Sequence, residues 1–309
     1  MSNVVVAIPA FRRPKGLAKL LDALARLETS ANVSVVVADN DADGLAGFAL
    51  CREVIAKGYR WPLAAIVAKD RGIAQCRNAL VEHILAHSNA DFVAMLDDDE
   101  WPDAHWLDSF LSVQRETNAD ALHGAVLREF EVEPETSALE CHGIAPLRHA
   151  TGAIQEIDST SNVLVRLSCF EAMPKPCFDP AFALSGGEDR DFFERLRRSG
   201  ARFAWADEAI VHAWVPASRA SVGWALKRAY RTGNSDMRVF LKHWDNRAEF
   251  ARELLKIAGV AALYPFVLLA PSPFVRGRAR ALCKLCRAAG KLAALMGHRY
   301  DEYATIHGG

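Results

Sequence analysis

The sequence predicts an α/β fold in which a mixed, mainly parallel sheet is flanked by helices and followed by a C-terminal helical region. Two observations predict this class. In the first third of the chain, short apolar runs alternate with segments of helical periodicity, as in a parallel sheet covered by helices. After Pro216 the pattern stays helical to the end. The 309 residues, about half of them apolar, suffice for one main domain with an appendage.

The first half of the chain contains the clearest strands and helices. The apolar runs predict strands at residues 4–8, 33–38, 64–67 and 92–96, separated by helices at residues 14–27, 44–57 and 72–87. Ligands of open α/β sheets bind beyond the carboxyl ends of the strands. The polar residues that follow the four strands, at 9–13, 39–43, 69–71 and 97–100, are therefore expected to converge on one cleft.

The second half predicts shorter elements. Residues 121–165 contain mixed strand-like pieces and end in the strand 162–165. Gly186, Gly187, Glu188 and Asp189 then open a helix at residues 191–199, and 203–205 and 209–212 predict two short strands. We therefore expect a main domain at 1–235, divided into 1–120 and 121–235, and a helical region at 236–309.

The C-terminal region combines an apolar segment with a basic one. Residues 257–270 are almost wholly apolar, but a spanning helix needs roughly 20 residues. The cations that follow have no acidic residue between them, and they are Arg276, Arg278, Arg280, Lys284, Arg287 and Lys291. This pairing favours a region that lies on an anionic membrane surface. The alternative is a packed helical hairpin with a solvated basic face.

Charge and cysteine content limit the class of binding partner and indicate the cellular compartment. Lys and Arg number 37 and Asp and Glu number 38, so the near-zero net charge argues against a nucleic-acid-binding protein. The seven cysteines are scattered, and the sequence starts without a signal peptide, which together predict a reducing cytoplasm. Cys283 and Cys286 form a lone CxxC, which favours two cysteines on one helix face over a zinc site.

An acidic run, Asp97, Asp98 and Asp99, directly follows the predicted strand 92–96. Adjacent carboxylates repel one another, so a fold that needed only to be stable would rarely place them together without a cation nearby. Mg²⁺ and Mn²⁺ prefer oxygen ligands and bridge to phosphate oxygens. The run therefore predicts a metal-diphosphate site, and a solvated acidic turn is the alternative.

Six stretches in this order resemble the inverting GT-A glycosyltransferases of family 2, a group that includes bacterial exopolysaccharide enzymes. They span about residues 3–235 and read VVVAIPAFRRP, VVVADNDADG, DRGIAQCRNALVEHIL, DFVAMLDDDEWPDAHWL, STSNVLVR and FDPAFALSGGEDRDFFERLRRSGARFAWADEAIVHAWVP. The resemblance implies a GT-A fold and metal-dependent transfer of one hexose from a nucleotide sugar, with UDP as the family's usual nucleotide. The chain lacks the Q-x-x-R-W motif of the processive synthases, which predicts one transfer per encounter.

The resemblance also implies a set of residues that bind the nucleotide. It places Pro9, Ala10, Phe11 and Arg13 around the nucleoside, with Asp39 accepting a hydrogen bond from uracil or ribose. Asp39 also suits an Asx-turn. By the same resemblance Arg77 and Asn78 lie near the acidic run, although Arg77 also suits a helix surface. Arg228 and Arg231, with Lys227, are expected to hold the departing diphosphate, and a solvated basic helix is the alternative.

The catalytic and metal-binding residues follow from the same resemblance. In the family's D-x-D signature the first acid meets the ribose and the last carries the metal, which here are Asp97 and Asp99 with Asp98 between them. Asp189 of the Glu188-Asp189 pair is expected to be the base that deprotonates the acceptor, and Glu188 to orient it. His212 is expected either to complete the metal shell or to be a core histidine.

The sequence therefore predicts a metal-dependent enzyme on the cytoplasmic face of the membrane. It would bind Mn²⁺ or Mg²⁺ and a UDP-sugar, and transfer the sugar to a saccharide or lipid-linked saccharide. Three other interpretations are a nucleotidyltransferase, a non-catalytic nucleotide-sugar-binding module and a peripheral membrane scaffold. The first expects a Gly-rich phosphate loop that is not seen after residues 4–8. The second expects loss of the base or of the metal-binding acid, and both are present. The third leaves the acidic clusters unexplained.

Overall fold

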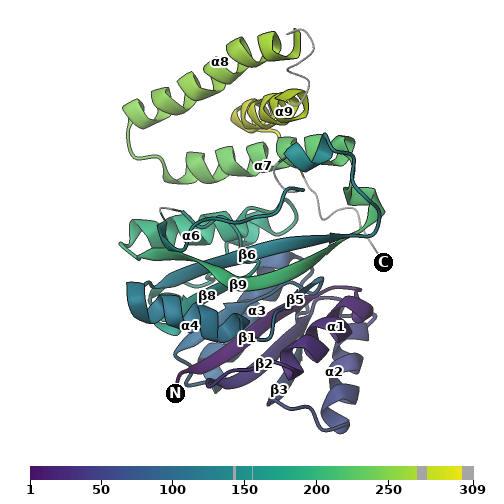
Figure 1. Ribbon diagram of the computed structural model, residues 1–309. Helices are drawn as coiled ribbons and strands as arrows, with labels where there is room; N and C mark the ends of the chain where they lie inside the picture. Colours follow the sequence, from purple (N-terminus) through teal and green to yellow (C-terminus); the bar gives the residue numbers. More distant parts are fainter. Residues whose placement is uncertain (142–143, 155, 270–276, 301–309) are drawn as a thin grey trace.

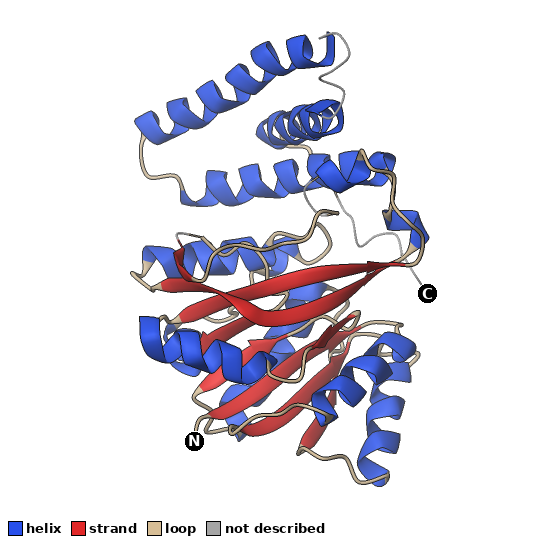
Figure 2. Ribbon diagram, in the orientation of Figure 1, coloured by secondary structure: helices blue, strands red, loops and turns tan. Residues whose placement is uncertain are grey.

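The computed structural model describes residues 1–141, 144–154, 156–269 and 277–300. A central twisted sheet has helices on both faces, and a group of long C-terminal helices is stacked beyond it (Figures 1 and 2). The path through the sheet runs β3-β2-β1-β4-β8-β6-β9-β5, and β7 pairs with β9. The predicted α/β class with a mainly parallel first half and a helical C-terminal region is confirmed.

The chain begins with a βαβ arrangement, as the sequence predicts. Its elements are β1 (Asn3–Ala10), α1 (Pro14–Ala25), β2 (Asn32–Asp39), α2 (Ala46–Ala56), β3 (Leu63–Val67), α3 (Ile73–His87) and β4 (Phe92–Met95). The four strands are parallel, and Ala10 pairs with Asp39 at the last step of the β1–β2 register. Runs of Val and Ala suit strands that are buried on both faces. All four carboxyl ends therefore reach the same edge of the sheet.

The elements that follow β4 add antiparallel strands to the sheet. They are β5 (Glu100–Pro102), α4 (Trp106–Thr117), β6 (Ala121–Phe130), η1 (Ala138–Glu140), β7 (Gly152–Ile154), β8 (Val163–Arg166), α5 (Leu167–Ala172), η2 (Pro180–Phe182), α6 (Glu188–Arg198) and β9 (Phe203–Val215). The prediction of two short strands at 203–205 and 209–212 is wrong, because β9 pairs along its length with β6, across an irregularity between Gly124 and Val126. The helix α6 also begins at Glu188, earlier than the predicted 191.

Two apolar layers hold the helices against the sheet. One layer joins α1 and α4 to one face through side chains such as Leu20 and Phe110. The other joins α3, α5 and α6 to the opposite face, with Phe170 and Phe192 stacked at 5.2 Å between ring centroids. Because both faces are covered, only the strand ends and the loops beyond them are open to a ligand.

The C-terminal region consists of η3 (Ala217–Arg219), α7 (Val222–His243), α8 (Arg247–Leu269) and α9 (Arg278–Leu295). The expected boundary at 235/236 falls inside α7. Helices α7 and α9 pack so closely that a Cβ at Gly290 would lie 1.9 Å from the carbonyl oxygen of Tyr230. Within the described residues, no helix is long and apolar enough to cross a membrane. The predicted apolar segment ends at Ala270 and the predicted basic segment begins at Arg276, and both of these residues lie outside the described residues.

Candidate active site

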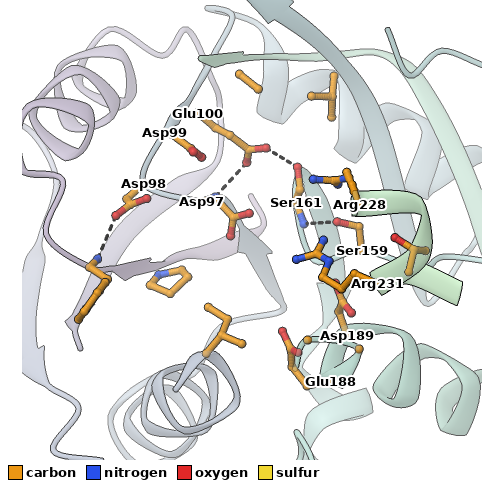
Figure 3. A pocket seen from close by; sticks show the side chains of 18 of the residues that line it. Asp97, Asp98, Asp99, Glu100, Ser159, Ser161, Glu188, Asp189, Arg228 and Arg231 are labelled. Atoms are coloured by element: carbon orange, nitrogen blue, oxygen red, sulfur yellow. Dashed lines mark hydrogen bonds between the residues drawn. The ribbon is translucent and has the colours of Figure 1, made fainter. Parts of the chain in front are cut away.

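A cavity of about 470 Å³ lies beyond the carboxyl ends of β1 and β4 and extends beneath α7. It collects most of the residues that the sequence singles out, namely Pro9, Ala10, Phe11, Arg13, Arg77, Asp97, Asp98, Asp99, Glu188, Asp189, Arg228 and Arg231. In Figure 3 the acidic run lies on one side and Glu188 and Asp189 on the other. Segments almost a hundred residues apart thus meet in one site.

The acidic run divides into residues with different contacts. Asp98 is buried and accepts hydrogen bonds from the backbone N–H of Phe11 at 3.0 Å and from Arg13 at 3.0 Å. Its carboxylate therefore fastens the loop after β1. Asp99 is 2.8 Å from the same guanidinium of Arg13 and 3.9 Å from Arg219. Asp97 and Asp99 both line the cavity, and their assignment as a D-x-D metal site stays a prediction.

Glu100 supports the acidic run, and the sequence analysis gives it no role. It is buried, its Oε2 accepts from the backbone N–H of Asp97 at 2.9 Å, and its Oε1 accepts from the Ser161 hydroxyl (Figure 3). Burial raises the pKa of Glu100 well above its ordinary value. A fourth acid that continues the run after the apolar strand at 92–96 is the signal that could have found it.

The second acidic pair begins α6. Gly186 and Gly187 precede it with φ of 74° and 104°, in the left-handed region that favours glycine, so the chain turns sharply before Glu188. Glu188 is buried and forms an ion pair with Arg77, whose other terminal nitrogen lies 3.3 Å from Asp97. A single buried guanidinium thus bridges the two acidic clusters. This is the predicted place for Arg77 and not the alternative on a helix surface.

Asp191, in the same predicted acidic cluster, has a structural role. Its buried carboxylate accepts from Arg195 at 2.9 Å and His243 at 2.8 Å and lies 2.7 Å from Lys242. It does not line the cavity. Asp191 therefore fastens α6 to α7, and only Glu188 and Asp189 face the site.

Comparison with known proteins gives the family. Residues 5–163, just over half of the chain, match the model of glycosyl transferase family 2. The chain belongs to that family. It is 29% identical over 311 residues to the succinoglycan biosynthesis protein ExoM of Rhizobium meliloti. The matched region covers 97% of this chain and 95% of the relative. The predicted glycosyltransferase activity is confirmed, and the nucleotidyltransferase alternative is not supported.

Solved structures show the same fold. The structure of residues 1–349 of TarS from S. aureus, in complex with UDP, matches with a TM-score of 0.54 and 15% identity over 97% of this chain and 93% of that one. Mannosyltransferase PcManGT from Pyrobaculum calidifontis, in complex with GDP-Man and Mn²⁺, matches with a TM-score of 0.63 and 13% identity over 95% and 87%. Identities this low establish the GT-A fold of this family 2 enzyme and nothing finer.

Other family 2 residues predicted from the sequence lie at the edge of the cavity or outside it. Asp39 is buried beneath the cavity, where its carboxylate accepts from the backbone N–H groups of Asp41 at 3.0 Å and Phe48 at 2.9 Å. These contacts give Asp39 the role of an Asx-turn residue. Asn78 pairs with the backbone of Phe178 and does not line the cavity. The cavity residue next to Asp39 is Asn40, which the sequence analysis missed.

Asn40 connects the loop after β2 with the loop between β3 and α3. Its side-chain N–H₂ donates to the carbonyls of Ala68 at 3.2 Å and Asp70 at 2.8 Å, and its Oδ1 accepts from the N–H of Gly72 at 2.8 Å. An amide that uses both its donor and acceptor atoms in this way can hold a loop firmly. Its position between two aspartates, in the stretch DND, gave no separate signal.

His212 lies away from the cavity, so its predicted place in the metal shell is not supported by the geometry. Its Nε2 is 3.0 Å from Asp103 and its Nδ1 is 3.0 Å from Glu129, while its ring stacks on Trp101 at 5.8 Å. The three residues that follow it on β9, Ala213, Trp214 and Val215, all line the cavity, whereas His212 does not.

Arg228 and Arg231 line the cavity from α7, whereas Lys227 is exposed and does not. The guanidinium of Arg228 lies 5.2 Å from the ring centre of Trp224. The charge of Arg231 favours the ionised form of Glu188 and so lowers its pKa. Together with Arg219, which the sequence analysis missed, they place positive charge over the acidic side chains.

Burial sets the protonation of the acids. It raises the pKa of Asp98 to about 7, against the opposing charge of Arg13, and raises the pKa of Asp99 in the same way. It also raises the pKa of Glu188 to about 7, with a further contribution from Asp189 and an opposing one from Arg77. The pKa of Asp189 is raised by burial and lowered by Arg77. Glu188 and Asp189 therefore titrate as a coupled pair.

This pair predicts a pH dependence. Because the two acids titrate together, kcat/KM should rise with pH through the raised pKa values of the pair, the higher of which is that of Glu188, about 7. In Glu188→Gln the rising limb should move to lower pH, because the second ionisation of the pair, which the charge of Asp189 raises, is removed. A pH–rate profile of both proteins checks this, with Glu194→Gln on the far side of α6 as the control. An unmoved limb in Glu188→Gln would contradict it.

The raised pKa of Glu188 also makes the stability of the folded protein depend on pH. Because the pKa of Glu188 in the folded protein lies above its ordinary 4.5, Glu188 favours the folded state below pH 4.5. That contribution is lost as the pH rises through about 7. The unfolding temperature of the wild type should therefore fall relative to that of Glu188→Gln over this range.

Proposed function

We propose that this family 2 enzyme is an inverting, metal-dependent hexosyltransferase whose donor is a UDP-sugar. The observation that carries the proposal is the meeting of two acidic clusters across one cavity, with buried Arg77 between them. Displacing a nucleoside diphosphate from a sugar needs positive charge at the leaving group and a base on the opposite face of the anomeric carbon. The cluster Asp97–Asp99 would supply the positive charge through the metal ion that it holds, and the pair Glu188 and Asp189 would supply the base.

The donor would lie along the carboxyl ends of β1 and β4. Pro9, Ala10 and Phe11 line this part of the cavity and offer a surface for the nucleoside. Asp97 and Asp99 would hold Mn²⁺ or Mg²⁺, both of which prefer oxygen ligands. Within the described residues no three metal-ligating side chains gather, so the remaining ligands would be diphosphate oxygens and water. The ion would neutralise charge on the leaving diphosphate.

The positively charged side chains add to that neutralisation. Arg13 contacts Asp98 and Asp99, and Arg219, Arg228 and Arg231 line the same cavity. A guanidinium can bind phosphate oxygens through charge-assisted hydrogen bonds. Arg228 and Arg231 would therefore hold the diphosphate as it departs, from the side of α7.

The acceptor would enter on the side of α6. Asp189 would take the proton from the acceptor hydroxyl as that oxygen attacks the anomeric carbon, and Glu188 would orient it. Such a single displacement inverts the anomeric configuration and gives a β-glycoside from an α-linked donor. The acceptor would be a saccharide or a lipid-linked saccharide, made on the cytoplasmic side for a polysaccharide or glycolipid. This class is supported by the likeness to a succinoglycan biosynthesis protein.

A release assay tests the donor assignment. The purified enzyme is incubated with UDP-glucose, UDP-galactose, UDP-glucuronic acid, UDP-N-acetylglucosamine and GDP-mannose, each with Mn²⁺, Mg²⁺ or EDTA. Metal-dependent release of UDP from one sugar nucleotide is the expected result. Release from GDP-mannose alone would overturn the choice of UDP, and equal release in EDTA would overturn the metal.

Helix α8 supports a peripheral membrane location. Leu263, Phe266 and Leu269 are 65%, 72% and 80% exposed, an unusual exposure for three large apolar side chains on one helix. Exposed Arg280 and Lys284 lie on the neighbouring α9, and residues 276–300 contain no acidic residue. An apolar face beside cations suits an anionic lipid surface.

The structure changes which helix would contact lipid. Arg287 and Lys291 of α9 form ion pairs with Asp236 and Glu253, and Cys283 is buried. Helix α9 is therefore packed against α7 and α8, as the helical-hairpin alternative expects. The apolar face of α8, and not α9 as a whole, is the surface we propose for lipid.

The membrane proposal predicts a loss of vesicle binding. In a triple variant with Leu263, Phe266 and Leu269 replaced by Gln, losing about 1 kcal/mol of partial burial at each side chain weakens partitioning by about a hundredfold. Co-sedimentation with vesicles of phosphatidylcholine and phosphatidylglycerol measures it. Val132→Gln, at an exposed apolar residue outside these helices, is the control. Undiminished sedimentation of the triple variant would refute the proposal.

A further inference from the structure

A buried histidine of the cavity has no role in the mechanism above. His123 lies on β6, is 3% exposed, and lines the cavity. Its Nδ1 is 3.0 Å from the carbonyl oxygen of Gly124. Its Nε2 is buried and has no hydrogen-bond partner among the described residues. Such an unpartnered buried polar atom is uncommon and costs free energy unless something binds it.

The protonation of His123 follows from its surroundings. Burial lowers its pKa to about 4, although the charge of Asp158 acts in the opposite direction. The ring is therefore neutral near pH 7. Because a carbonyl oxygen can only accept, the single ring proton resides on Nδ1 and donates to Gly124. This leaves Nε2 with a bare lone pair that can only accept a hydrogen bond.

The ring is held rigidly. It stacks on Trp205 with 4.9 Å between centroids and 18° between planes, and His149 packs edge-on against the same Trp205 at 4.6 Å. The adjacent Gly124 has no room for a side chain, because a Cβ there would lie 2.4 Å from the carbonyl oxygen of Ala209. A fixed acceptor loses little freedom when a ligand binds, so its hydrogen bond can discriminate between ligands.

The chemistry of Nε2 limits what it can bind. A bare lone pair repels phosphate and carboxylate oxygens, so a diphosphate is not its partner. Metal binding would need further ligands, and no group of three metal-ligating side chains occurs in the part of the chain that the structure describes. A hydroxyl is the fitting partner. His123 also stands on β6, apart from the loops after β1 and β2 that carry Phe11 and Asn40.

We propose that Nε2 of His123 accepts a hydrogen bond from a hydroxyl group of a saccharide bound in the cavity and so helps to select the sugar. The inference rests on the proposed function, because it needs a sugar in this cavity. The hydroxyl belongs either to the hexosyl group of the donor or to the acceptor saccharide. Both present the same chemistry to Nε2.

The test compares variants on sugars that each lack one hydroxyl. His123→Phe keeps an aromatic ring against Trp205 and removes the acceptor atom, while His123→Gln keeps an acceptor at a similar reach. His149→Phe is the matched control, because His149 contacts Trp205 but does not line the cavity. For each protein, kcat/KM is measured for nucleotide release without acceptor and for transfer. The donors are the preferred nucleotide hexose and its monodeoxy forms, and the acceptors are treated likewise.

One missing hydroxyl should lower kcat/KM of the wild type by about tenfold through its lost hydrogen bond. His123→Phe should show the same loss with the complete sugar and no further loss with that one deoxy sugar. His123→Gln and His149→Phe should keep the discrimination. A pattern seen in release without acceptor assigns the hydroxyl to the donor, and one seen only in transfer assigns it to the acceptor. Full discrimination retained by His123→Phe in both assays would overturn the proposal.

A second measurement does not depend on turnover or on the variants folding. The ¹⁵N resonance of Nε2 in the wild type is followed while nucleotide sugars with Mg²⁺, and then free saccharides, are added. The resonance should move upfield when Nε2 accepts a hydrogen bond. An unchanged resonance at saturation with every bound sugar would overturn the inference. Failure of the proposed function would instead appear as the absence of nucleotide-sugar binding.

Discussion

Replacing Asp189 with asparagine is expected to lower turnover by about 10²- to 10⁴-fold, the usual contribution of a positioned base. Asp189 lines the cavity at the start of α6, and burial raises its pKa toward the range useful for a base. Asparagine keeps the shape of the side chain but cannot take a proton. The affinity for the donor should change little, because the proposed nucleotide site lies on the opposite side of the cavity, at residues such as Phe11.

Steady-state kinetics and nucleotide-binding calorimetry of Asp189→Asn test this split between kcat and affinity. Glu194→Gln is the control on the same helix, since Glu194 pairs with Arg197 and Arg198 outside the cavity. If kcat of Asp189→Asn stays within tenfold of the wild type, Asp189 is not the base.

The second large effect is expected at Asp99. In the wild type, Mn²⁺ should tighten UDP binding by about a hundredfold, because a divalent ion between Asp99 and the diphosphate contributes several kcal/mol. Asp99→Asn removes the charged ligand and should bind UDP equally weakly with Mn²⁺ and with EDTA. Calorimetric titration with UDP under both conditions measures the difference.

Asp103→Asn provides the control for this experiment. Asp103 lies a few residues further along and contacts His212 at 3.0 Å, outside the cavity. This variant should retain the full effect of Mn²⁺. If Asp99→Asn retains it as well, the ion is held elsewhere and the D-x-D assignment fails.

The parallel half of the fold and the acidic run are predictable because their signals are local. Residues 4–8 and 33–38 are almost continuous runs of apolar residues, and Asp97 directly follows such a run. The turn at Gly186 and Gly187 likewise marks the start of α6 within a few residues. Where strand ends and helix starts carry the site, local patterns suffice to find its main acids.

The rest depends on contacts between distant segments. His212 and Ala213 are adjacent in the sequence, yet Ala213 lines the cavity and His212 does not, and only the pairing of β9 with β5 and β6 decides this. Glu100 gains its role from Ser161, which is 61 residues away. The unpartnered Nε2 of His123 is invisible in the sequence, because a histidine in an apolar run is ordinarily a satisfied core residue.

The C-terminal region shows the same limit. The helical prediction is confirmed for the described residues 257–269 and for the cations from Arg278 to Lys291, but composition does not tell which face of each helix is packed. Arg287 and Lys291 are drawn into ion pairs by Asp236 and Glu253, acids that lie 51 and 38 residues earlier. Leu263 and Phe266 stay exposed because no element covers that side of α8 in the part of the chain that is described.

Metal-dependent transfer with inversion determines which anomer is released first from the donor. Concentrated enzyme is given its preferred α-linked nucleotide hexose with Mg²⁺ and no acceptor, and ¹H NMR follows the anomeric protons before the free sugar equilibrates. We expect the β-anomer to appear first and EDTA to stop its formation. Early appearance of the α-anomer, or unchanged release in EDTA, would contradict it.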